Sequence, residues 1–291
     1  MTQQVDTDAE AVAPATGAET RAALLERSKR NIAPIRREFV QLPAGSPKRA
    51  SVLSSFVSHR DKRALNAYLL LLAINSSGQG AGGWSTRLPL AVWARAFDTD
   101  LTTTGASATA AASKVLTRLE NRKLITRSRR GRERQVQVEL LREDGSGEPY
   151  TRPGAGNNDR FLVLSNDYWT EGWHEELELP GIAMLLVALH EKPGFRLPAE
   201  HSPQWYGWSA DTTERGFAEL VDANLLLKET KLVKAPLSPT GLAKVNEYHL
   251  LPPFSPRHKV PAATPPSKSK RPSMSTRRRG SAASRRRKAT Q

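Results

Sequence analysis

The stretch "SATAAASKVLTRLENRKLITRSRRGRERQVQV", residues 107–138, combines a helical pattern with a hairpin pattern. Ala112, Leu116 and Leu119 recur at helical spacing, so one side of this helix is expected to be buried. After the helix come an apolar pair, a charged turn and an alternating run over 136–141, which are typical of two strands and their connection. The stretch therefore predicts a helix that leads into a β-hairpin.

The turn of this hairpin holds a high density of positive charge. Five arginines fall within the eight positions 127–134, interrupted by the single acidic residue Glu133. Arginines held this close repel one another, and a polyanion such as DNA offsets the repulsion. A solvated charged turn is the plainer alternative, but such turns usually mix the two signs of charge. We therefore expect the hairpin to contact DNA through Arg127, Arg129, Arg130, Arg132 and Arg134.

The residues before this stretch extend the pattern into a domain. An apolar helix is expected over 64–74, a short helix over 88–98, and a turn over 99–107. The order of helix, short helix, turn, helix and basic hairpin resembles that of the winged helix-turn-helix families. The resemblance implies that the helix after the turn lies in the major groove of DNA.

The side of this helix opposite its apolar stripe is polar. It carries short hydroxyl groups and two cations that can reach base edges or phosphates, and the backbone N–H groups near Gly105 are free to bind a phosphate. The DNA-binding residues predicted on the helix are Thr109, Ser113, Lys114, Thr117 and Arg118.

The second half of the chain looks like the same pattern, in "GWSADTTERGFAELVDANLLLKETKLVK" (207–234). Ser209 is expected to cap the helix, with Phe217 and Leu220 facing the core. This helix has four carboxylates against one arginine, and lysines on the following hairpin partly restore a basic surface. Whether this copy contacts DNA or docks to a protein partner, such as a second copy of the chain, stays open. Its candidate DNA contacts are Arg215, Lys228, Lys231 and Lys234.

These patterns predict an α+β protein with two consecutive winged helix-turn-helix domains. Both ends of the chain have compositions that cannot bury a core. The predicted organisation is a disordered acidic N-terminus (1–20), an N-terminal helical arm (21–58), a first winged helix domain (59–143), a linker (144–159), a second winged helix domain (160–254) and a disordered basic tail (255–291).

Composition narrows the partners further. The 291 residues carry a net charge of +15, and residues 255–291 hold twelve Lys or Arg without one Asp or Glu. There is no cysteine, so disulfides and thiolate metal sites are excluded. No apolar run approaches the roughly 20 residues that span a bilayer. We expect a soluble cytoplasmic protein, associated with the nucleoid and without membrane contact.

Motifs of catalysis and cofactor binding are weak or incomplete. "GQGAGG" (78–83) matches a dinucleotide-binding fingerprint in letters, but a Leu-rich helix precedes it where a strand is required. The six histidines lack metal-ligand spacing, and no serine lies in a nucleophile elbow. We therefore expect no enzyme, no cofactor, no metal and no small-molecule ligand.

The function that these observations favour is sequence-specific binding of double-stranded DNA, with the first domain and its arginine-rich hairpin as the main anchor. Both replication initiation of a mobile element and transcription regulation are compatible with it. A second hypothesis is a non-enzymatic nucleoid or assembly protein that binds nucleic acid non-specifically through its basic tail. In that case the second domain would serve as a protein-interaction module.

Overall fold

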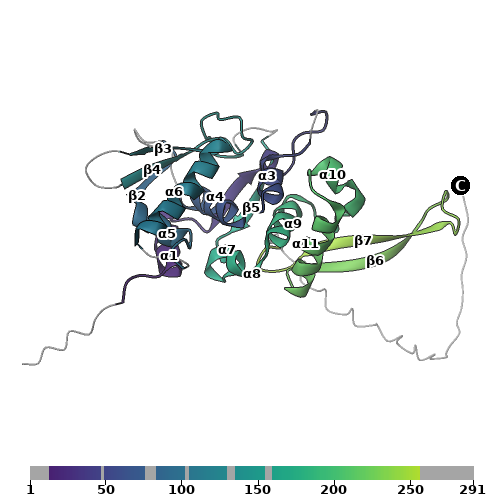
Figure 1. Ribbon diagram of the computed structural model, residues 1–291. Coiled ribbons are helices and arrows are strands. Elements are labelled where there is room, and N and C mark those ends of the chain that lie inside the picture. Colours follow the sequence, from purple (N-terminus) through teal and green to yellow (C-terminus); the bar gives the residue numbers. More distant parts are fainter. Residues whose placement is uncertain are drawn as a thin grey trace, which may run out of the picture. The chain divides into compact units, whose positions relative to one another are not determined.

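The computed structural model describes residues 13–46, 49–75, 83–101, 105–129, 135–154 and 159–255 (Figure 1). These residues form a mixed α+β protein, as the sequence predicts, and none of their helices is long and apolar enough to cross a bilayer. The elements are α1 (Gly17–Ser28), β1 (Ile32–Arg36), α2 (Arg37–Val40), α3 (Val52–Ser58), α4 (Lys62–Ile74), β2 (Ser85–Pro89), α5 (Leu90–Ala96), α6 (Gly105–Asn121), β3 (Ile125–Arg129), β4 (Gln135–Leu140), β5 (Phe161–Ser165), α7 (Asp167–Thr170), α8 (Trp173–Glu176), α9 (Leu179–His190), η1 (Ala199–His201), α10 (Ser202–Trp205), α11 (Ala210–Asp222), β6 (Leu226–Lys234) and β7 (Leu242–Leu250).

The elements from α4 to β4, residues 62–140, make up the first helix–hairpin region. Its three strands form an antiparallel sheet in the order β2–β4–β3, so the first strand pairs with the last. Helix α6 buries Ala112, Leu116 and Leu119 completely, which confirms the predicted apolar side. Strand β2 was not expected from the sequence, because Thr86 is its one buried residue and the period of two is therefore not visible.

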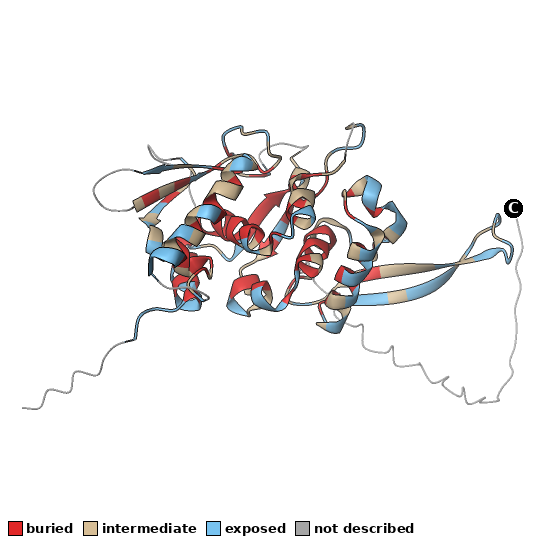
Figure 2. Ribbon diagram, viewed as in Figure 1, coloured by how far each residue is buried: buried red, intermediate tan, exposed pale blue. Residues whose placement is uncertain are grey.

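The elements from α9 to β7, residues 179–250, make up the second helix–hairpin region. Ser209 caps α11 by accepting a hydrogen bond from the Thr212 N–H, and Phe217 and Leu220 are buried, as predicted. Strands β6 and β7 form the predicted hairpin, and Phe195 pairs with Tyr248 on β7 as an isolated bridge. In Figure 2 the hairpin has buried residues at its base, and beyond them β6 is mostly exposed while β7 is mostly of intermediate burial.

Helices α9 and α11 approach each other at two glycines. A Cβ on Gly216 would lie 2.5 Å from the Met184 side chain and closer still to the Pro180 carbonyl oxygen, and one on Gly181 would meet the Glu219 carboxylate. Only glycine therefore allows this spacing between the two helices. The same contact places the Glu219 carboxylate of α11 at the start of α9, so this acid of α11 is engaged by the neighbouring helix.

The predicted helical arm over 21–58 is wrong in its middle part. Residues 32–36 form β1, which pairs antiparallel with β5, and the pair buries Ala33 and Ile35 against the core. The partner strand lies after the whole first region, so no local pattern in the sequence indicates it. Helices α1 and α4 also pack together, which makes this segment part of the body.

The described part of 144–159, predicted as a linker, packs on the body rather than running free. Tyr150 is buried and its ring meets that of Trp84 edge-on at 5.1 Å. The buried Arg36 guanidinium pairs with Glu143 at 2.7 Å and with Asp159 at 2.9 Å. The arginine on β1 thus ties both ends of the segment to the β1–β5 sheet.

The acidic end predicted as disordered is helical from Gly17 onward. Thr16 and Glu19 form a reciprocal capping box at the start of α1, which satisfies two backbone N–H groups. The rest of that prediction, residues 1–12, and the basic tail from 256 lie outside the described residues.

Candidate nucleic-acid interface

Helix α6 presents one exposed cation on its polar side. Lys114 is exposed and makes no ion pair with the described residues. The hydroxyls predicted beside it are occupied within the helix: Thr109 donates to the Ala106 carbonyl, and Thr117 donates to the Ser113 carbonyl. Among the residues predicted on α6, Lys114 is therefore the one whose charge is fully available to a ligand.

Arg127 on β3 lies against α6 instead of extending from the hairpin. Its guanidinium donates to the Ser113 carbonyl at 2.9 Å and to the Thr117 hydroxyl at 2.9 Å, and its Nε pairs with Glu120 at 2.8 Å. Arg127 of the hairpin thus contacts three residues of α6 at once: Ser113, Thr117 and Glu120. We conclude that Arg127 fixes the orientation of the hairpin relative to α6 and neutralises the acid of that helix.

Arg118 and Arg122 of α6 converge on Asp61, the N-cap of α4. Arg118 Nε lies 2.9 Å from Asp61 Oδ2, and Arg122 Nη2 lies 3.1 Å from the same oxygen. The Arg118 side chain stays 41% exposed, whereas Arg122 stacks over the Phe56 ring at 4.3 Å. Arg118 can still reach a ligand from this position, but part of its hydrogen-bonding capacity is already used.

The tip of the first hairpin is only partly described. Arg129 is exposed at the end of β3. The remaining predicted contacts, Arg130, Arg132 and Arg134, lie outside the described residues.

Within 105–129 the single carboxylate, Glu120, is already paired with Arg127, while Lys114, Lys123 and Arg129 are exposed. Asp61 of α4 is held by two arginines. Carboxylates near phosphates oppose binding, and one carboxylate of the hairpin is open: Glu139 on β4, opposite Thr126 of β3, is exposed and forms no ion pair with the described residues. The surface of α6 and β3 themselves is positive without an unpaired acid.

Helix α11, at the corresponding place in the second region, has a different surface. Arg215 pairs with Asp211 one turn earlier, at 2.9 Å, and both side chains are exposed. Glu219 accepts a hydrogen bond from the Glu178 N–H at the start of α9, so this carboxylate stabilises a helix N-terminus. Glu214 and Asp222 have no described cation within ion-pair distance. The exposed surface of α11 is acidic.

The second hairpin separates its charges between two faces. On one face Lys231 pairs with Glu229 at 3.1 Å and with Glu247 at 2.5 Å, and Glu247 also binds Arg196. These two cations lower the pKa of Glu247 to about 2. The other face carries three lysines that form no ion pair with described residues. They are Lys228, Lys234 and Lys244.

A cleft of about 750 Å³ lies between this second face and α11. Its walls include Lys228 and Lys244 from the hairpin, but also Glu214 and Asp222 from α11. A cleft with both signs of charge does not suit a polyanion.

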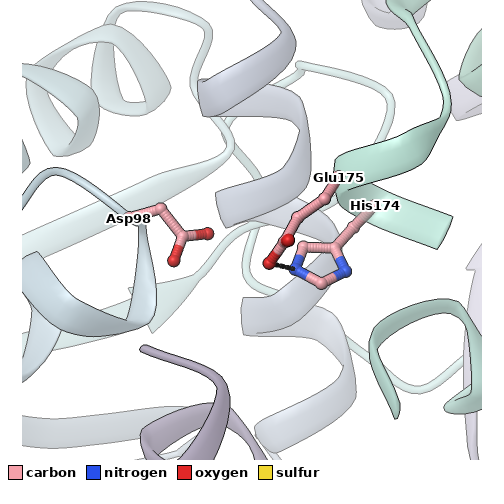
Figure 3. A group of neighbouring side chains, drawn as sticks. All are labelled: Asp98, His174 and Glu175. Atoms are coloured by element: carbon pink, nitrogen blue, oxygen red, sulfur yellow. Dashed lines mark ion pairs between the residues drawn. The ribbon is translucent and has the colours of Figure 1, made fainter. Parts of the chain in front are cut away.

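Two groups of acids and histidine have the spacing of metal ligands in the described residues, Asp98–His174–Glu175 and Glu229–Glu247–His249. Figure 3 shows the first, with His174 and Glu175 from α8 facing Asp98. Arg21 binds Asp98 at 2.5 Å and Glu175 at 2.9 Å, and Lys231 holds both glutamates of the second group. Each group already surrounds a cation of the protein, so we assign neither as a metal centre.

Comparison with protein-family models, with curated proteins and with solved structures finds no match for this chain. The function must therefore be inferred from the chain's own residues. The sequence did not indicate that Asp61 holds two arginines of α6, or that Lys244 lies on the lysine-bearing face of the second hairpin. It predicted Arg127 as a DNA contact, whereas the structure has Arg127 bound to α6. An aspartate at the N-cap position of a helix was visible as a capping signal, but its second role toward α6 was not.

Proposed function

We propose that this protein binds double-stranded DNA with sequence preference, through α6 and the β3–β4 hairpin. The observation that carries the proposal is the positive surface formed by Lys114, Arg129 and the exposed part of Arg118, next to which Glu120 and Asp61 are paired with arginines. Phosphates supply most of the affinity for such a surface, and side chains of a helix in the major groove supply the preference.

The fold proposed for this region is a winged helix-turn-helix. Support comes from the order α4, β2, α5, α6, β3, β4 and from the sheet order β2–β4–β3, in which the hairpin forms the wing. The same order is found in α9, the Phe195 bridge, α10, α11 and the β6–β7 hairpin. We therefore propose a second domain of the same type over 160–254.

The second domain is proposed mainly as a docking module for protein. Its helix is acidic, and the adjoining cleft carries both signs of charge, which favours a protein surface over a nucleic acid. Contact of the hairpin lysines with DNA flanking the main site is a weaker alternative. Roles in replication initiation of a mobile element and in transcription regulation both agree with this arrangement.

The competing function, non-specific binding through the basic tail, is favoured by the charge of residues 255–291 alone. The two functions differ in sequence preference, because a disordered cationic segment attracts all duplexes alike. Selection from random duplexes separates them, using the full chain and a chain that ends at Pro256. Both chains keep their N-terminal part, because removing β1 would leave β5 without its partner strand.

We expect the shortened chain to retain the selected sequence while the salt dependence of its binding becomes weaker. Each neutralised phosphate contributes about 0.9 to the log–log slope, so loss of a tail that engages several phosphates lowers the slope by several units. Loss of preference together with the tail would contradict the proposed function and support the non-specific one.

A further inference from the structure

A cavity of about 510 Å³ lies among α1, α4, the end of α5 and the short helices α7 and α8. Its volume is in the range of small-molecule sites. An apolar wall is formed by Ala67, Leu70, Phe97 and the Trp169 ring, and cationic side chains, including Arg60 and Arg63, line the cavity as well. The cavity shares no residue with the proposed DNA-binding surface of α6 and β3.

Two buried N–H donors of the lining have no hydrogen-bond partner among the described residues. They are Trp169 Nε1 and Arg21 Nε, on residues that are 6% and 3% exposed. The indoles of Trp93, Trp173 and Trp208 are satisfied, by Val136, Glu171 and Thr213. Leaving a buried N–H without a partner is unfavourable, so two such donors on one cavity indicate a ligand that supplies their acceptor.

The charges around these atoms define the ligand's chemistry. The Arg21 guanidinium neutralises Asp98 and Glu175 through its two terminal nitrogens, which leaves its Nε–H directed elsewhere. The Trp169 indole can only donate. Arg60 and Arg63 are exposed and form no ion pair with the described residues. A ligand here must therefore offer acceptor atoms, and the arginines favour a negative charge.

His174 is engaged within the protein. Its Nδ1 lies 3.3 Å from the Tyr168 carbonyl oxygen, and its Nε2 lies 3.1 Å from the Glu175 carboxylate. Burial, together with Arg21, lowers the pKa of His174. The groups that the cavity offers to a ligand are therefore donors, from Trp169 and Arg21.

We propose that this cavity is a binding site for a small organic carboxylate with a flat apolar body. The carboxylate accepts hydrogen bonds from the Trp169 and Arg21 N–H groups, and the apolar body packs on Leu70 and Phe97. Asp61 connects the site with α6, because it lines the cavity and also holds Arg118 and Arg122. Occupancy of the cavity thereby acts on the position of α6, a consequence that rests on the proposed function.

Binding is tested on the full chain with phenylacetate, using benzylamine and benzyl alcohol as matched probes without the carboxylate. The readout is the indole N–H signals in ¹H–¹⁵N NMR spectra, assigned by Trp169→Phe and Trp173→Phe. Titration extends to about 10 mM, since a probe of this size binds with a Kd near 1 mM. We expect the Trp169 signal to move and saturate with phenylacetate, while the Trp173 signal, already bonded to Glu171, stays in place.

Two variants check the assignment. Trp169→Phe keeps an aromatic ring but removes the donor, and Arg63→Gln removes an exposed charge of the lining without touching the core. Each should weaken phenylacetate binding at least threefold, followed in Trp169→Phe through backbone amide signals because the Trp169 indole signal is lost. Melting curves without the probe establish that both variants are folded. The proposal is overturned if the Trp169 signal does not move, or if benzylamine moves it as strongly as phenylacetate does.

The connection to α6 is tested separately. Phenylacetate should change the affinity for the selected DNA in the unaltered chain, and in Trp169→Phe the same change should require at least threefold more phenylacetate. An NMR shift at Trp169 without any change in DNA affinity removes the connection but leaves the binding site. A chain that binds phenylacetate and no DNA contradicts the proposed function alone.

Discussion

The two helix–hairpin regions share an order of elements but differ in what their surfaces can bind. Over 105–134 the sequence carries nine basic and two acidic residues, whereas 210–234 carries four basic and five acidic ones. In the first region the acid of the helix is covered by Arg127, and in the second the exposed acids of α11 lie open. The same arrangement of elements thus carries surfaces of different charge, and under our proposal it is this charge that decides the partner of each region.

The largest expected difference between the regions is in the response to charge reversal on their hairpins. Arg129→Glu with Arg130→Glu should weaken DNA binding roughly 100-fold or more, because two phosphate contacts become repulsive. Lys228→Glu with Lys231→Glu is the matched control and should cost less than about tenfold. Binding is measured by fluorescence anisotropy at one fixed salt concentration. Equal losses from both pairs would show that the ranking of the two regions is wrong.

The regions also differ in how closely their central helices pack. Gly216 on α11 corresponds to Val115 on α6, and only the glycine faces a backbone at a distance too short for a Cβ. Gly216→Ala should therefore lower the free energy of unfolding by about 1–3 kcal/mol, whereas Val115→Ala leaves a cavity and costs a similar amount for the opposite reason. Urea denaturation measures both changes. A Gly216→Ala variant as stable as the unaltered chain would contradict the close approach of α9 and α11.

The smallest expected effect is the change in stability at low pH. Burial and Arg21 lower the pKa of His174, so the unfolded chain takes up its proton first as the pH falls below about 6.5. The stability that the neutral ring contributes is present above that pH and is lost as the pH falls further. Glu247 in the second region keeps its charge down to about pH 2 and does not respond in this window.

The His174→Asn variant should accordingly lose less melting temperature between pH 7 and pH 5 than the unaltered chain. Glu247→Gln, the control in the second region, should leave the difference between the two pH values unchanged. A steeper dependence in His174→Asn than in the unaltered chain would show that the histidine is charged in the folded protein.

The sequence predicts those parts of the fold that are stabilised by local patterns. The buried sides of α6 and α11 and both hairpins follow from apolar spacing and from the Ser209 cap, and the structure has them. Strand β1 could not be predicted in this way, because its pattern is short and its partner β5 follows the entire first region. Local periodicity does not report which strands pair across such a separation.

The candidate site could be predicted as a surface but not as a set of contacts. Composition locates the positive charge on α6 and the first hairpin, yet it does not show that Arg127 turns back onto Thr117 or that Arg118 meets Asp61. These pairings depend on the angle between the helix and its neighbours. The sequence therefore cannot distinguish an arginine that holds the fold, such as Arg127, from one that is available to a ligand, such as Arg129.

The most direct test of the central claim is the base preference of α6. Lys114→Ala and Arg118→Ala are compared with the unaltered chain on the selected duplex and on its single-base variants, after circular dichroism has established that both are folded. If the helix reads bases, each variant should lose about 1–3 kcal/mol on the selected duplex and should relax the preference at one position. Lys114 should show the clearer effect, because Arg118 is partly held by Asp61. Uniform weakening on all duplexes by both variants would contradict the claim that α6 reads DNA sequence.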